Sequence, residues 1–216
     1  MPKGFTDEED DSTCLKLKKS LYGLSEAPKN WNVHLFKALY DMGFVSCSID
    51  NCLLLRKDMI IIMYVDDAGI ACKTEKEADA FINELKKKGF ELEKEGSFEE
   101  YLGIKFDKTK DGTVHMRQKG LINKIITALG LKGCKPSHTP TQKEALGMDK
   151  EGELSTETWN YASIVGMMQY VATNSRSDIT YAVSQVARFT HSPKQSHSQA
   201  VKKIGRYLAG TSDKGI

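Results

Sequence analysis

The stretch "MIIIMYVDDAGIAC", residues 59–72, constrains the fold of this chain more than any other part of the sequence. Two apolar segments of strand length flank a pair of adjacent acidic residues, Asp66 and Asp67. Apolar strands on both sides of a short polar connection are typical of an antiparallel hairpin. Neighbouring carboxylates repel each other and are costly in an apolar setting unless a cation or hydrogen-bond donors compensate them. The pattern therefore predicts a buried sheet strand that ends at an acidic hairpin tip.

Composition places the chain among ordinary globular proteins, because 40% of its 216 residues are hydrophobic and 28% are charged. The longest apolar run, residues 59–65, is too short to span a bilayer. The first residues, "MPKGFTDEEDDS", have neither a basic nor an apolar signal-peptide region, so we expect no signal peptide. None of the five cysteines forms a CxxC motif, which favours reduced thiols in an intracellular protein.

Charge is distributed unevenly along the chain, although the formal net charge is only +2. Residues 7–11 are all acidic, whereas residues 105–135 carry eight basic and two acidic side chains. A basic segment of this kind can follow a phosphate backbone. The alternative is an ordinary solvated face, and the charge pattern alone does not decide between the two.

The first half of the sequence predicts a mixture of helices and antiparallel strands. Pro28 suits the first turn of a helix whose apolar positions continue to Met42, before Gly43. Thr74 and Glu77 form a capping-box signature for a second helix. The strands predicted between these helices are residues 52–55, 59–64 and 68–72, with residues 56–58 as a turn.

The second half of the sequence predicts one more hairpin and then helices. Strands 101–106 and 113–116 flank a turn at residues 111–112, and an apolar stripe predicts a helix over residues 121–129. Residues 131–156 lack a clear period and are interpreted as a linker. Three helices are then expected near residues 157–173, 178–190 and 195–209, with Ser177 or Asp178 capping the middle one.

Five ordered blocks of the sequence resemble the reverse transcriptases of copia-type (Ty1/copia) retrotransposons. The motif "YVDD" at residues 64–67 resembles their polymerase signature, and it is accompanied by four longer blocks. These blocks are "LKKSLYGLSEAPKNW" (17–31), "YLGIKF" (101–106), "YASIVGMMQYVATNSRSDITYAVSQVARF" (161–189) and "AVKKIGRYLAGTSDKGI" (200–216). A lone four-residue motif is weak evidence, whereas five blocks in the family's order identify the chain as a partial Pol polyprotein of this kind.

The resemblance implies roles for particular residues. Asp66 and Asp67 would be catalytic carboxylates that bind Mg²⁺ or Mn²⁺. Tyr64 and Val65 would contact the nucleotide or template, with Val65 near the primer end. A template- and nucleotide-binding block and a primer grip are also implied, together with Lys94 as a general acid that protonates pyrophosphate. The block comprises Gly23, Ala27 and Pro28, and the primer grip comprises Tyr101, Leu102, Gly103 and Ile104. Turn and strand-end geometry would explain the glycines and the proline equally well, and a surface position would explain the lysine.

Family polymerases also carry an upstream catalytic aspartate, in a block like "LDVKNAFL" that precedes a "PPGF" loop. Here "MPKGF" already resembles that loop, so this block and the upstream fingers are expected to be absent, and a ribonuclease H domain would follow residue 216. We therefore expect the chain alone to have little or no polymerase activity. The implied partners are an RNA or DNA template with its primer, a dNTP, and the remaining Pol segments, with no membrane. Family members act in the cytoplasm inside virus-like particles, and a nuclear location is the alternative.

The predicted fold is α/β, an incomplete reverse-transcriptase palm followed by a helical thumb or connection segment. The expected divisions are a partial palm over 1–110, the start of the thumb over 111–132, a linker over 133–156, and a helical connection segment over 157–216. Three other interpretations stay open: a non-catalytic nucleic-acid-binding remnant of a mobile element, an unrelated palm-like nucleotidyl cyclase, and a decaying gene fragment without a role.

Overall fold

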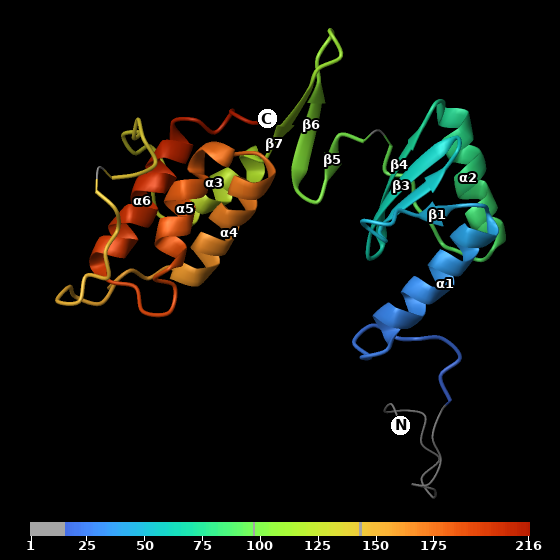
Figure 1. Ribbon diagram of the computed structural model, residues 1–216, viewed down its shortest axis with the longest axis horizontal. Helices are drawn as coiled ribbons and strands as arrows, with labels where there is room; N and C mark the ends of the chain where they lie inside the picture. Colours follow the sequence, from blue (N-terminus) through green and yellow to red (C-terminus); the bar gives the residue numbers. More distant parts are fainter. Residues whose placement is uncertain (1–15, 97, 143) are drawn as a thin grey trace, which may run out of the picture. The chain divides into compact units, whose positions relative to one another are not determined.

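The computed structural model describes residues 16–96, 98–142 and 144–216, which form a mixed α/β protein (Figure 1). The chain divides into two compact units, Met1–Gly96 and Ser97–Ile216, each with its own hydrophobic core. Each unit contains a small antiparallel sheet and helices. This division differs from the boundaries at residues 110, 132 and 156 that the sequence suggested. Within the described residues, no helix is long and apolar enough to cross a membrane.

The first unit is a four-stranded antiparallel sheet with helices packed against one face. The strands follow the order β1-β2-β3-β4, and each strand pairs with its neighbour in the sequence. Helices α1 and α2 bury Leu39 and Phe81 in the same core as Ile61 of the sheet. The elements are α1 (Ala27–Asp41), β1 (Val45–Ser46), β2 (Leu53–Arg56), β3 (Met59–Tyr64), β4 (Asp67–Cys72) and α2 (Glu75–Lys87).

Local sequence signals explain most boundaries in this unit. Pro28 occupies the first turn of α1, where its missing N–H costs no hydrogen bond. The predicted capping box forms at α2, because the Thr74 side chain accepts from the Glu77 backbone N–H and the Glu77 carboxylate accepts from the Thr74 N–H. Gly43 and Gly89 follow the two helices with positive φ angles of 84° and 92°, which glycine adopts without strain.

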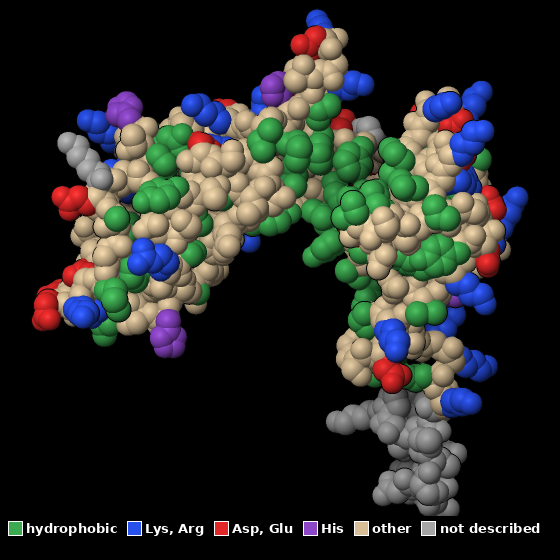
Figure 2. All heavy atoms as spheres, viewed as in Figure 1, with side chains coloured by type: hydrophobic (Ala, Val, Ile, Leu, Met, Phe, Trp, Pro, Cys, Tyr) green, Lys and Arg blue, Asp and Glu red, His purple; other side chains and the backbone are tan. Residues whose placement is uncertain are grey.

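Strand β3 alternates strictly between buried and exposed side chains, as a strand with one covered face should. Met59, Ile61 and Met63 face the core, whereas Ile60 and Ile62 are 47% and 41% exposed. Figure 2 shows hydrophobic side chains at the surface over this sheet. One face of the sheet is therefore apolar and uncovered within the described residues.

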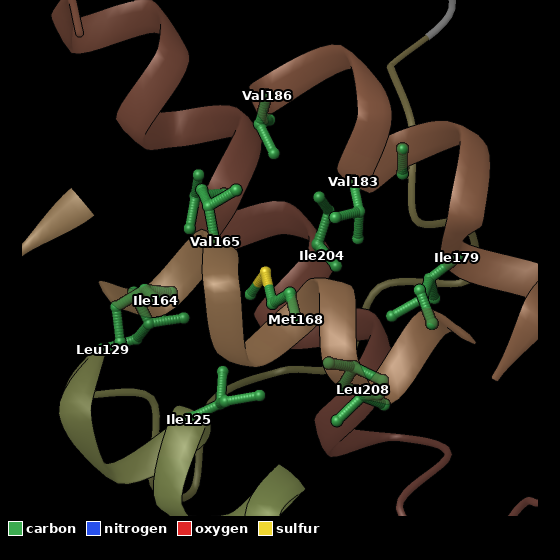
Figure 3. Packing of buried hydrophobic residues seen from close by; sticks show 14 of the residues in the cluster. Ile125, Leu129, Ile164, Val165, Met168, Ile179, Val183, Val186, Ile204 and Leu208 are labelled. Atoms are coloured by element: carbon green, nitrogen blue, oxygen red, sulfur yellow. The ribbon is translucent and has the colours of Figure 1, made fainter. Parts of the chain in front are cut away.

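The second unit begins with a three-stranded antiparallel sheet, in the order β5-β6-β7, and continues as a helical bundle. The helices share one core, which includes Met168, Ile204 and Leu208 (Figure 3). The elements are β5 (Glu100–Tyr101), β6 (Ile104–Lys108), β7 (Val114–Arg117), α3 (Lys119–Ala128), α4 (Tyr161–Asn174), the 3-10 helix η1 (Ser177–Ile179), α5 (Thr180–Ala187) and α6 (Gln195–Ala209).

The predicted single strand over residues 101–106 is wrong, because the chain reverses in its middle. Strands β5 and β6 pair through Tyr101 and Ile104, so Leu102 and Gly103 form a two-residue turn. Their φ angles are 52° and 74°, the combination that a type I′ hairpin turn requires. Asparagine and glycine are the usual residues of such a turn. Because leucine stands at the first turn position here, the sequence did not predict the turn.

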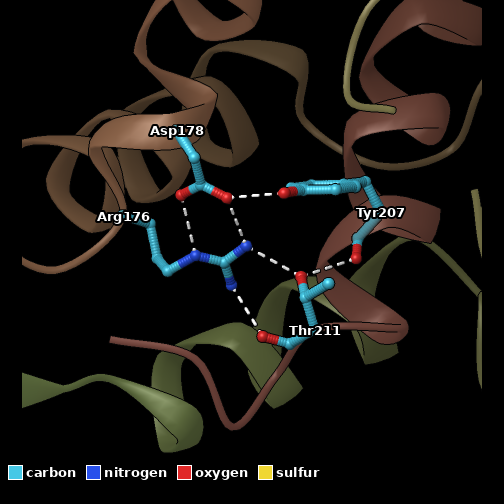
Figure 4. A network of polar contacts seen from close by, with 4 residues as sticks. All are labelled: Arg176, Asp178, Tyr207 and Thr211. Carbon is cyan, nitrogen blue, oxygen red and sulfur yellow. Dashed lines mark hydrogen bonds and ion pairs between the residues drawn. The ribbon is translucent and has the colours of Figure 1, made fainter. Parts of the chain in front are cut away.

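The predicted cap of the middle helix by Ser177 or Asp178 does not form. A 3-10 turn precedes α5, and no side chain caps that helix. Instead, both carboxylate oxygens of Asp178 accept from the guanidinium of Arg176, whose side chain is 1% exposed (Figure 4). Arg176 also donates to the carbonyl and hydroxyl oxygens of Thr211, and Tyr207 donates to Asp178. The network joins the start of η1 to the end of α6.

Residues 131–156 form no helix or extended strand in their described part, yet they do not separate two units. The Ser137 N–H donates to the carbonyl of Arg206, and the Gly147 carbonyl lies 2.9 Å from His197 Nε2. Helix α3 lies before this segment and packs in the same core as α4, α5 and α6 after it. The segment is therefore a loop that crosses the helices of one unit.

Candidate functional site

The acidic pair lies at the tip of the β3–β4 hairpin, as the sequence predicted. Tyr64 pairs with Asp67 across the strands, so Val65 and Asp66 form a two-residue turn. Val65 has a φ of 57°, which is rare and strained for a β-branched residue. Asp66 and Asp67 are both exposed, and neither forms an ion pair with any described residue. The hairpin tip therefore presents two adjacent carboxylates to solvent.

Trp31 of α1 holds this turn from outside the hairpin. Its indole Nε1 donates a hydrogen bond of 3.0 Å to the carbonyl oxygen of Val65. The indole ring is half-buried and meets the ring of Phe90 edge-on, with the ring centroids 5.9 Å apart. The bond spans 34 positions in the sequence, so the helical spacing of Trp31 gave no sign of it. The only signal was its place at the end of the 17–31 block.

The other residues predicted from the 17–31 block lie at or before the start of α1. Gly23 has a φ of 93° in a turn, Ala27 is the first residue of α1, and Pro28 follows it. All three are thus explained by chain geometry. Because α1 continues from them directly into Trp31, they also set where this helix begins relative to the indole that contacts the hairpin.

Lys94 is held by two carboxylates of α2 and does not stand free as a proton donor. Its Nζ lies 2.7 Å from Asp79 and 2.9 Å from Glu75. These bonds, with that to Asp79 the stronger, raise the pKa of Lys94 above its ordinary value. A raised pKa makes the ammonium a poorer acid, so this arrangement does not favour the general-acid role.

The predicted primer-grip residues belong to the second unit, where they form the β5–β6 hairpin. The Leu102 carbonyl at its turn accepts a 2.7 Å hydrogen bond from the Tyr170 hydroxyl of α4. Gly103 follows, and a side chain built there would meet nothing within 4 Å. The turn therefore has an open outer surface, and its backbone is attached to the helical bundle.

No group of three or more metal-ligating side chains occurs in the part of the chain that the structure describes. Asp66 and Asp67 nevertheless supply carboxylate oxygens, the ligand type that Mg²⁺ prefers. Two carboxylates suit part of a magnesium site, and further oxygen ligands are needed to complete one.

Comparison with known proteins identifies the family of the chain. A family model described as "Reverse transcriptase (RNA-dependent DNA polymerase)" matches residues 1–143. The chain therefore belongs to the reverse transcriptase family, in the form found in Ty1/copia retrotransposon Pol polyproteins. The hairpin at residues 64–67 lies inside the matched region.

Three relatives illustrate the similarity, and the chain spans only a small share of the first of them. It is 32% identical to the Retrovirus-related Pol polyprotein from transposon RE1 of Arabidopsis thaliana, over 100% of this chain and 15% of that protein. It is 29% identical to the polyprotein from transposon TNT 1-94 of Nicotiana tabacum, over 97% of this chain and 17% of that protein. It is 27% identical to the putative transposon Ty5-1 protein of Saccharomyces cerevisiae, over 97% of this chain and 69% of that protein. No solved structure matches the chain significantly.

Proposed function

We propose that the β3–β4 hairpin is the metal-binding part of a polymerase site that transfers nucleotides to a primer on an RNA or DNA template. The observation that carries this proposal is the exposed acidic turn, with Trp31 bonded to its backbone. A nucleotidyl-transfer site needs carboxylates held in fixed positions at an open surface. The family and the "YVDD" sequence both support this assignment.

Asp66 and Asp67 would hold Mg²⁺, or Mn²⁺ in its place, through their carboxylate oxygens. A bound divalent cation there would activate the attacking primer hydroxyl and stabilise the leaving phosphate oxygen. The chain's own contribution is positional. The two-residue turn fixes the spacing of the carboxylates, and the indole of Trp31 fixes the turn.

The remaining roles follow from the same proposal. Tyr64 and Val65 would lie beside the primer end, and the β5–β6 hairpin of residues 101–104 would hold the primer strand. The first unit would be part of a polymerase palm. The second unit would provide the primer grip and a helical thumb or connection segment. Gly23, Ala27 and Pro28 would shape the nucleotide-binding surface through the start of α1.

Metal binding can be measured on this chain directly. We expect Mn²⁺ to broaden amide NMR signals around residues 64–67 and to bind more weakly in Asp66→Asn and Asp67→Asn. The matched control is Asp41→Asn, which removes an exposed carboxylate at the end of α1. Equal Mn²⁺ binding by all three variants and the unchanged chain would contradict the assignment.

Activity requires a separate measurement. The described residues bring two carboxylates to the hairpin, whereas the family resemblance implies a further catalytic aspartate in an upstream block. We therefore expect the pure chain to show little or no Mg²⁺-dependent primer extension. Clear extension that disappears in Asp66→Asn would show that two carboxylates suffice and would refute this expectation.

A further inference from the structure

An open cleft of about 870 Å³ lies in the second unit. Its walls are the β5–β6–β7 sheet, the first turn of α3, and the side of α4 that carries Gly166 and Tyr170. Four basic side chains line it, namely those of Lys105, Arg117, Lys119 and Lys124. Three acidic residues, Glu100, Asp107 and Asp213, also line it. The excess of positive charge is small, so charge alone does not identify a ligand.

The ion pairs in the cleft leave its basic groups available to an anion. Lys105 and Arg117 lie 3.3 Å and 3.4 Å from Asp107, and both distances are long for charge-assisted hydrogen bonds. Lys119 pairs with Asp213 at 2.6 Å, but both side chains are largely exposed. Exposed pairs contribute little stability and exchange partners easily. Lys124 forms no ion pair with any described residue.

The N-terminus of α3 opens into the same cleft. No side chain caps this ten-residue helix, and its first turn contains no acidic residue. The N–H groups of a first helical turn have no partner inside the helix, and the helix dipole makes them attract negative charge. Gly120 lies in that turn, and a side chain built there would meet nothing within 4 Å. An anion can therefore approach the backbone closely.

A buried amide supplies a second, independent sign of a ligand. Gln118, the residue before α3, lines the cleft and is only 1% exposed. Its Oε1 accepts a 2.8 Å hydrogen bond from the Ser175 hydroxyl, whereas its Nε2 has no partner among the described residues. Buried side-chain donors are nearly always paired, so an unpaired one in a cleft wall is suited to an incoming acceptor.

We propose that this cleft binds a phosphate group. A phosphate has several strong acceptor oxygens, which match the first-turn N–H groups of α3, the Gln118 amide and the ammonium of Lys124. The phosphate belongs either to a nucleic-acid backbone or to a free phosphate or nucleotide. The first source rests on the proposed function, but the site itself does not require Asp66 or Asp67.

The decisive variant is Gly120→Asp, tested with inorganic phosphate by titration calorimetry and ³¹P NMR. The new carboxylate occupies the anion position and also suits a helix N-terminus, so the variant should fold at least as stably as the unchanged chain. We expect its phosphate affinity to fall about tenfold or more, because like charge replaces charge-assisted bonds. Gly147→Asp is the control, since it makes the same change of charge at an open glycine that does not line the cleft. Failure to bind phosphate, or equal losses in the two variants, would overturn the proposal.

A second pair of variants separates the site from general surface charge. Lys124→Gln should weaken phosphate binding, whereas Lys150→Gln, at an exposed lysine outside the cleft, should not. The source is identified by competition. A short DNA strand that displaces phosphate, when its uncharged methylphosphonate analogue does not, assigns a nucleic-acid backbone. Displacement by dNTP but not by the DNA strand assigns a free phosphate. If Lys150→Gln weakens binding as much as Lys124→Gln, the cleft is not the site.

Discussion

At the residue scale, the strained conformation of Val65 is the most unusual feature of the hairpin. A β-branched side chain at a φ of 57° costs about 1–2 kcal/mol, and Val65 is largely exposed, so little packing offsets this cost. We predict that Val65→Gly raises the free energy of unfolding of the first unit by about 1 kcal/mol, measured by urea denaturation. Val45→Gly, at an exposed position in strand β1, should instead lower it. A loss of stability in Val65→Gly would contradict the strain argument.

Trp31 provides the matching test of how the turn is held. Trp31→Phe keeps an aromatic ring against Phe90 but removes the donor to the Val65 carbonyl. We expect a loss of about 1 kcal/mol and faster amide exchange at residues 65–67, measured by NMR. In Trp159→Phe the indole bond to Glu157 is lost instead, and exchange at the hairpin should stay unchanged. Unchanged exchange in Trp31→Phe would show that the indole does not fix the turn.

Asp178 gives the second unit a defined dependence on pH. Its hydrogen bonds from the Arg176 guanidinium hold the pKa of the Asp178 carboxyl below its ordinary value of 3.8. A lowered pKa in the folded state contributes stability that is present above the ordinary value and is lost as the pH falls toward the folded pKa. We predict that Asp178→Asn lowers the stability of the second unit at neutral pH. The variant should also lose less stability than the unchanged chain as the pH falls below about 4, measured by thermal unfolding. An equally steep decline in the variant would contradict the assignment.

At the element scale, two helical glycines provide a matched pair. A Cβ at Gly205 of α6 would lie 2.7 Å from methyl carbons of both Leu129 and Leu131, whereas one at Gly166 of α4 would meet nothing within 4 Å. Gly205→Ala should therefore cost about 1–3 kcal/mol through overpacking. Gly166→Ala should stabilise its helix by about 1 kcal/mol. Chemical denaturation measures both, and stabilisation by both substitutions would show that α6 can shift to accept a methyl group.

Elements with strong local signals were predictable, and those that depend on distant partners were not. The acidic hairpin and the capping box at Thr74 follow from adjacent residues, and both are present. The turn at Leu102 was missed because its backbone conformation opposes the preference of leucine. Asp178 was expected to cap a helix, but its carboxylate accepts hydrogen bonds from the Arg176 guanidinium instead. The bond from Trp31 to the hairpin has no periodic signature, because only the folded chain brings the two together.

At the scale of the whole molecule, two separate cores predict two unfolding steps. Trp31 lies in the first unit and Trp159 in the second, so each indole reports on one core. Leu39→Ala should destabilise the Trp31 transition by about 3 kcal/mol and leave the Trp159 transition in place. Val201→Ala should destabilise the Trp159 transition and leave the Trp31 transition in place. These transitions can be resolved by tryptophan fluorescence in variants that retain a single indole, and one shared transition in every variant would contradict independent cores.

The bond between Tyr170 and the Leu102 carbonyl has a consequence for the position of the hairpin turn. The turn of the β5–β6 hairpin is attached through this 2.7 Å bond to α4, which packs in the centre of the helical core. One hydrogen bond of this kind contributes about 1 kcal/mol, so it favours the position of the turn beside α4 over other positions. If the turn holds the primer strand, as proposed, this bond would connect the position of that strand to the helical core of the second unit.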